Sequence, residues 1–211
     1  SFDFKNFRFN LVDTPGHSDF SEDTYRTLTA VDAAVMVIDG AKGVESQTRK
    51  LFEVCRLRDL PIFTFCNKMD RESRDIYEII DEIQDNLAID VTPASWPIGV
   101  GQDFLGCYDL INDSLDLVDK ANRNLSVASI KIDGLNDPEL QKHVPKDLSK
   151  KLVDEVEMVK ELLPKLDKKS ILEGHLTPIW FGSAINSFGV KELMNGLGEL
   201  APEPQIQKAF P

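Results

Sequence analysis

The sequence predicts an α/β fold, in which a mostly parallel sheet is covered by helices on both faces. Two near-continuous apolar runs, at residues 33–39 and 61–66, are typical of strands buried on both sides. Amphipathic helices are expected after them at 46–58 and 74–87, where apolar residues recur at three- and four-residue steps. Buried strands that alternate with such helices indicate a parallel sheet between two helical layers.

The same reasoning places four further elements around this core. The run 7–12 predicts another buried strand, and residues 21–31 predict a helix. Near the end of the chain a buried strand returns at 177–182, and a last helix is expected at 190–200. Pro202 and Pro204 then indicate a linker over residues 202–211.

The alternation breaks between these two halves. From about residue 91 the pattern changes to short strands with polar turns, and residues 138–174 show a strongly charged helical pattern. We therefore expect an inserted α+β subdomain over 91–174. The main domain is then formed by residues 1–90 and 175–201.

Composition restricts the classes of partner. The 211 residues carry a net charge of −12, from 36 acidic and 24 basic side chains. Such a surface is expected to hold RNA only weakly by phosphate contacts. No apolar run approaches the roughly 20 residues of a membrane span. The three cysteines have no metal-site spacing, which is typical of reduced cytoplasmic thiols.

The segment Asp13-Thr14-Pro15-Gly16-His17 follows the first predicted strand. A carboxylate at a strand end is the usual place for a side chain that holds Mg²⁺, which favours Asp13 as the metal residue. Thr14 and Pro15 fix the turn, and Gly16 lets its backbone N–H approach a terminal phosphate. His17 comes next and can point at an attacking water. The five residues predict a γ-phosphate and metal sensor.

The segment Asn67-Lys68-Met69-Asp70 follows the strand predicted at 61–66. The Asp70 carboxylate can accept two hydrogen bonds, from N1–H and the 2-amino group of guanine, and adenine offers neither. Asn67 can bond another edge of the base and the neighbouring loops, while the stem of Lys68 covers the base face. Because it lies 54 positions after Asp13, with one βα unit between, the segment predicts guanine recognition.

A third element is Gly182-Ser183-Ala184, directly after the returning strand. The backbone N–H groups of Ser183 and Ala184 can bond guanine O6. From Asp70 to Ser183 the chain runs 113 positions, whereas a minimal domain needs about 30 residues for one βα unit. The difference supports an insertion of about 80 residues between the two guanine loops.

The 211 residues contain no phosphate-binding loop of the usual kind, because no glycine-rich segment ends in Gly-Lys-Ser or Gly-Lys-Thr. The first residues, Ser1-Phe2-Asp3-Phe4, have the pattern of a strand interior. We therefore expect the sheet to be incomplete at the N-terminus, with apolar strand edges exposed. Such a chain should bind GTP poorly and leave it unhydrolysed.

The Asp-Thr-Pro-Gly-His form resembles the translational GTPases, which share a P-loop-NTPase-like sheet. The insertion is similar to the extra subdomain of elongation factor G and of bacterial peptide chain release factor three. Residues 20–32, 43–51 and 96–99 favour the release factor, and the similarity covers essentially the whole chain.

The resemblance implies a cytoplasmic, ribosome-bound GTPase that uses GTP and Mg²⁺ and promotes departure of class I release factors. Asp13 would then serve the metal, and Gly16 and His17 would form the catalytic pair. Guanine would be held by the other two segments, through Asn67, Lys68, Asp70, Ser183 and Ala184. Two alternatives stay open: a translocation GTPase of the elongation factor G type, and a binding module without catalysis.

Overall fold

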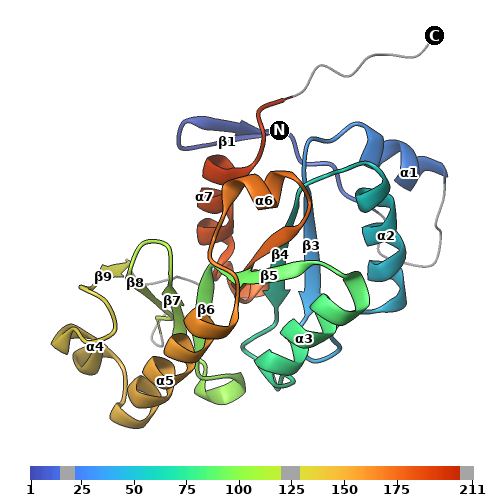
Figure 1. Ribbon diagram of the computed structural model, residues 1–211. Helices are drawn as coiled ribbons and strands as arrows, with labels where there is room; N and C mark the ends of the chain where they lie inside the picture. Colours follow the sequence, from blue (N-terminus) through green and yellow to red (C-terminus); the bar gives the residue numbers. More distant parts are fainter. Residues whose placement is uncertain (15–21, 120–128, 205–211) are drawn as a thin grey trace.

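The computed structural model describes residues 1–14, 22–119 and 129–204 (Figure 1). Its centre is a four-stranded parallel sheet in which the last strand of the chain lies between two earlier ones. In spatial order the strands are β3 (Ala34–Asp39), β4 (Ile62–Asn67), β10 (Leu176–Phe181) and β5 (Asp90–Pro93). This arrangement confirms the predicted parallel sheet.

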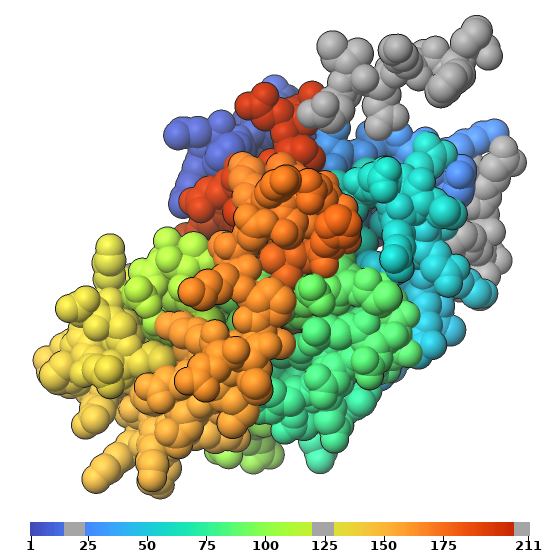
Figure 2. Space-filling model, viewed as in Figure 1, coloured from blue at the N-terminus to red at the C-terminus, as the bar shows by residue number. Residues whose placement is uncertain are grey.

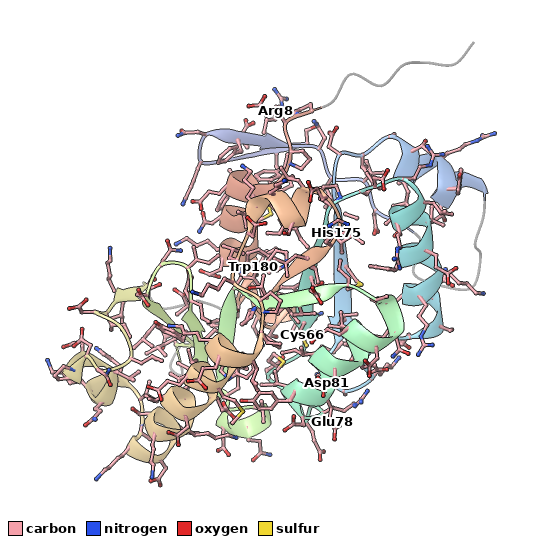
Figure 3. The ribbon with its side chains drawn as sticks, in the orientation of Figure 1. Arg8, Cys66, Glu78, Asp81, His175 and Trp180 are labelled. Carbon is pink, nitrogen blue, oxygen red and sulfur yellow. The ribbon has the colours of Figure 1, made fainter. Side chains whose placement is uncertain are left out.

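Helices cover both faces of this sheet, as predicted. Alternate residues of β4 show the two faces: Ile62 and Cys66 belong to the larger apolar core, whereas Phe63 and Phe65 belong to a second cluster with Trp180. Figure 3 shows Trp180 and Cys66 inside the molecule. The helices beside this sheet are α1 (Glu22–Thr29), α2 (Ser46–Leu57), α3 (Ile76–Leu87), α6 (Lys168–Leu172) and α7 (Val190–Leu200). Of these, α6 falls inside the range predicted for the insertion, yet it contacts β10 of the parallel sheet.

The first strand prediction was wrong. Residues 7–12 do not join the parallel sheet; β2 (Phe7–Phe9) pairs antiparallel with β1 (Phe2–Phe4) in a separate hairpin. Phenylalanines alternate with polar residues along it, and Lys5 at the turn has a φ of 51°. Alternation of this kind produces a two-stranded ribbon with one apolar face. Leu11, beyond the hairpin, is 76% exposed.

One edge of the parallel sheet carries apolar side chains in contact with solvent. Among the described strands β3 is the outermost on that side, and its Val35 and Val37 are 39% and 55% exposed. Strands with open hydrogen-bonding edges and exposed apolar side chains are templates for pairing. The exposed edge that the sequence predicts is therefore present at β3.

The inserted segment forms a four-stranded antiparallel sheet with helices packed beside it. The boundary predicted at residue 91 falls within β5, which belongs to the parallel sheet. The elements of the insertion are β6 (Ser95–Ile98), η1 (Gly101–Asp103), β7 (Gly106–Asp109), β8 (Ser114–Leu117), β9 (Ile130–Lys131), α4 (Pro138–His143) and α5 (Lys146–Leu162).

The insertion shares its apolar core with the parallel sheet. The fully buried Trp96 ring lies 5.7 Å from Phe181 of β10 and 5.5 Å from Tyr77 of α3, measured between centroids. Its Nε1 donates to Glu155 on α5 at 2.9 Å. The Phe181 backbone N–H donates to Ser95 Oγ at 3.0 Å. In Figure 2 the insertion runs from green through yellow to orange, and its orange part lies directly against the green surface that includes α3.

Three carboxylates, on α7 and on two strands of the inserted sheet, lie close enough to interact electrostatically. Asp109 and Asp116 are buried in β7 and β8, and Glu192 of α7 is partly buried near them. Burial, followed by repulsion from Asp116, raises the pKa of Glu192 to about 7. Burial also raises the pKa of Asp116.

None of the described helices has the length and apolarity to cross a bilayer.

Candidate guanine-nucleotide site

Asn67 joins the two loops that the sequence assigns to guanine. It is the last residue of β4, and its side-chain Oδ1 accepts from the backbone N–H of Lys68 at 2.8 Å. The same oxygen accepts from the N–H of Ala184 at 2.9 Å, across 117 positions of sequence. The expected bond from Asn67 to a neighbouring loop is therefore present.

Gly182 locks the backbones of these loops together. Its N–H donates to Cys66 O, and its carbonyl accepts from the N–H of Met69, both at 3.0 Å. A Cβ on Gly182 would lie 2.3 Å from the carbonyl oxygen of Phe188, so no other residue fits without moving the backbone. Adjacent parallel strands thus bring the predicted loops to one end of the sheet.

The loop after β10 closes on itself. The Ser183 N–H donates to Phe188 O at 3.1 Å, and the Phe188 N–H returns to Ser183 O at 2.9 Å. Ser183 is buried and its Oγ accepts from Asn186 Nδ2 at 3.0 Å. Ala184 is exposed beside it. The loop therefore has a fixed shape with its outer residue accessible.

Asp70 presents an acceptor that has no internal partner. Its Oδ1 is buried, and no described group donates a hydrogen bond to it. The residue lines a cavity of about 480 Å³ together with residues 71–73 and 100–102, whereas the other residues predicted to hold guanine do not line it. A buried acceptor without a donor costs free energy, roughly 1–3 kcal/mol, unless a ligand supplies one. Adjacent N–H donors of a guanine base fit this requirement.

Lys68 has a partner that the sequence analysis missed. Its Nζ lies 2.5 Å from Oδ2 of Asp39, at the end of the neighbouring strand β3. Oδ1 of Asp39 accepts from the N–H groups of Ala41 and Lys42. Burial raises the pKa of Asp39, but these donors together outweigh it and lower that pKa. Asp39 ends an apolar strand just as Asn67 does, and that parallel was the available signal.

The structure does not place the first motif at this end of the sheet. Asp13 is exposed and Thr14 half-buried, and both follow the separate N-terminal hairpin. Pro15, Gly16 and His17 lie outside the described residues. The predicted position of Asp13 at the end of a buried strand is therefore wrong, because the hairpin replaces that strand.

A metal role for Asp13 stays a prediction. Among residues 1–14, 22–119 and 129–204, no three His, Cys, Asp or Glu side chains are arranged to hold a metal ion. Mg²⁺ usually keeps several waters and takes one or two carboxylates together with substrate phosphates. A single carboxylate such as Asp13 is compatible with that chemistry.

Comparisons with known proteins agree with this geometry. A crystal structure of a protein from Thermus thermophilus superimposes with a TM-score of 0.65 over 90% of the chain, at 20% sequence identity. The chain spans 29% of the length of that protein, and the likeness shows the fold. A model of the elongation factor Tu GTP-binding domain matches residues 1–203. This chain therefore belongs to the elongation factor Tu GTP-binding domain family of the translational GTPases.

Proposed function

We propose that the chain recognises guanine nucleotides as part of a ribosome-associated GTPase. The observation that carries this proposal is the buried, unpartnered Oδ1 of Asp70, which lies in a loop tied to Ala184 through Asn67. Asp70 would accept from the base, and the backbone N–H groups near Ser183 and Ala184 would face its O6. Lys68, held by Asp39, would cover the base with its apolar stem.

The phosphate side of the site is proposed from the sequence motif. There Asp13 would hold Mg²⁺ through water, and Gly16 would offer its N–H to the γ-phosphate. His17 would orient the attacking water, since phosphoryl transfer depends mainly on positioning and charge stabilisation. Mg²⁺, when bound, would neutralise part of the negative charge of the phosphates. Hydrolysis would then yield GDP and phosphate.

Within the family, we propose the release-factor role: promoting departure of class I release factors from the ribosome at termination. Residues 20–32, 43–51 and 96–99 support it by their resemblance. The second candidate is translocation of the elongation factor G type. Ribosomes stalled at a stop codon separate them, because a release-type factor accelerates loss of a labelled class I factor without moving the messenger RNA.

Calorimetric titration with GDP, GTP and ATP in magnesium buffer tests nucleotide recognition. It compares this chain with a protein extended upstream of Ser1 through a Gly-Lys-Thr loop. We expect the extended protein to bind both guanine nucleotides and ignore ATP. Asp70→Ala should abolish that binding, and Asp81→Ala, on the exposed side of α3 (Figure 3), should leave it unchanged.

Stability separates a lost contact from a lost fold in this experiment. Asp70→Ala removes an acceptor without an internal partner, so the free energy of unfolding should stay the same or rise. If the extended protein binds no guanine nucleotide, the segment from Asn67 to Asp70 is a polar turn only, and the proposed function is wrong.

A further inference from the structure

A short turn of the insertion, Gly99–Phe104, lies against both guanine loops. We propose that this turn is a third loop of the nucleotide site, which positions the other two and links the insertion to nucleotide occupancy. The inference rests on the proposed function for its ligand. Its structural part stands on contacts within the chain.

The first contact holds the loop between Asn67 and Asp70. The N–H of Gly101 donates to the carbonyl of Met69 at 3.0 Å. Backbone also packs on backbone here: a Cβ on Gly101 would lie 3.5 Å from Arg71 O and 3.7 Å from Glu72 N. The turn therefore supports the guanine loop directly before and after Asp70.

The second contact holds the loop after β10. The Phe104 ring meets the Phe188 ring edge to face, with centroids 5.3 Å apart and planes at 88°. Both rings are buried. Phe188 exchanges two backbone hydrogen bonds with Ser183, so the aromatic pair fixes the segment that begins the second loop.

The turn itself has one available shape. Gly99 has a φ of +74°, and a Cβ there would lie 2.2 Å from Asp103 O. Its ends are joined by the Leu105 N–H, which donates to Ile98 O at 2.9 Å. A turn that is closed in this way transmits displacement of β6 and β7 to both loops.

The cavity beside Asp70 has walls from both parts of the molecule. Val100, Gly101 and Gln102 line it together with the segment from Asp70 to Ser73. Ser73 Oγ, like Asp70 Oδ1, is buried without a described partner. A base that satisfies Asp70 is thus next to the insertion, so ligand binding and the position of the insertion are linked equilibria.

A matched pair of glycine variants tests the proposal. Gly101 and Gly134 both lie in the insertion with positive φ, +61° and +76°, and neither would bring a Cβ closer than 3.5 Å to another residue. Alanine at either position is disfavoured roughly five- to thirtyfold by backbone strain. The two variants therefore impose similar strain, but only Gly101→Ala lies at the guanine loops.

Hydrogen exchange on this chain is the first readout. We expect Gly101→Ala to speed exchange of the Met69, Ala184 and Phe188 amides by roughly fivefold or more, whereas Gly134→Ala leaves them unchanged. The second readout is GDP affinity in the protein extended upstream of Ser1. There Gly101→Ala should weaken binding roughly fivefold or more, and Gly134→Ala should match the wild type.

The outcomes separate this inference from the proposed function. Equal behaviour of the two variants in exchange and in GDP affinity would overturn the third-loop proposal. If the wild-type extended protein binds no GDP, the proposed function fails together with the link to occupancy. The exchange result on this chain then decides whether the turn orders the two loops.

Discussion

Replacing Glu192 with glutamine should stabilise the protein at neutral and alkaline pH. Glu192 lies on α7 beside the buried Asp116 and Asp109, and burial followed by repulsion from Asp116 raises its pKa from 4.5 to about 7. Lys191 opposes this rise only in part. Above that pKa the folded chain holds a largely buried negative charge on Glu192. Glutamine keeps the size of the side chain and removes the charge.

The magnitude follows from the difference in pKa between the two states. The native state binds the Glu192 proton more tightly than the unfolded state, so the free energy of unfolding falls as pH rises from 4.5 to about 7. Each pKa unit corresponds to about 1.4 kcal/mol, which gives a loss of about 3 kcal/mol above pH 7. Glu192→Gln should recover this loss at high pH and change little below pH 4.5.

Urea unfolding of the wild type and the variant, from about pH 4 to about pH 8, measures this difference. Glu199→Gln is the control, because Glu199 is exposed on the same helix. We expect the gap between variant and wild type to open across the window and the control to run parallel to the wild type. A gap that is constant with pH would refute the reasoning, since only titration of Glu192 makes it change.

Two further predictions concern the sheet edge and the thiols. Val37→Lys places a charge on the exposed edge strand β3, so it should reduce self-association at high protein concentration without lowering the urea midpoint. Sedimentation velocity measures the association. Unchanged association would show that this edge does not mediate it. Burial raises the pKa of Cys55 to about 11 and that of Cys66 to about 12, and raises that of Cys107 as well. An aromatic disulfide reagent at about pH 8 should therefore modify all three only as fast as the protein unfolds, and fast labelling of the native state would contradict the burial.

Periodicity was sufficient to predict the elements that carry strong local patterns. The last helix lies at 190–200 as expected, and the apolar runs became adjacent parallel strands. Because parallel strands end at one edge, the meeting of Asn67 with Ala184 follows from the pattern. The fold and the meeting of these two loops were thus accessible to sequence reasoning, whereas their role in binding guanine stays a prediction.

Other features depend on tertiary choices that a local pattern does not contain. Residues 7–12 were interpreted as one apolar run, although Arg8 and Asn10 interrupt it and favour the hairpin with β1. Leu57 falls within the apolar pattern of residues 46–58, yet it is 78% exposed at the last position of α2. The turn at Gly101 contacts the loop at Met69 through one backbone hydrogen bond, and no residue type in the sequence predicts such a contact.

The place of β10 in the sheet also governs the order in which the molecule can assemble. This strand is made after the insertion, yet it lies between β4 and β5. On a ribosome that adds about 5–20 residues per second, the apolar edge of β4 stays unpaired for several seconds until β10 has been synthesised. The hydrogen bond between Asn67 and Ala184, 117 positions apart, can form only after that. Nascent chains should therefore gain nucleotide-site geometry in one late step, and the insertion sets its timing.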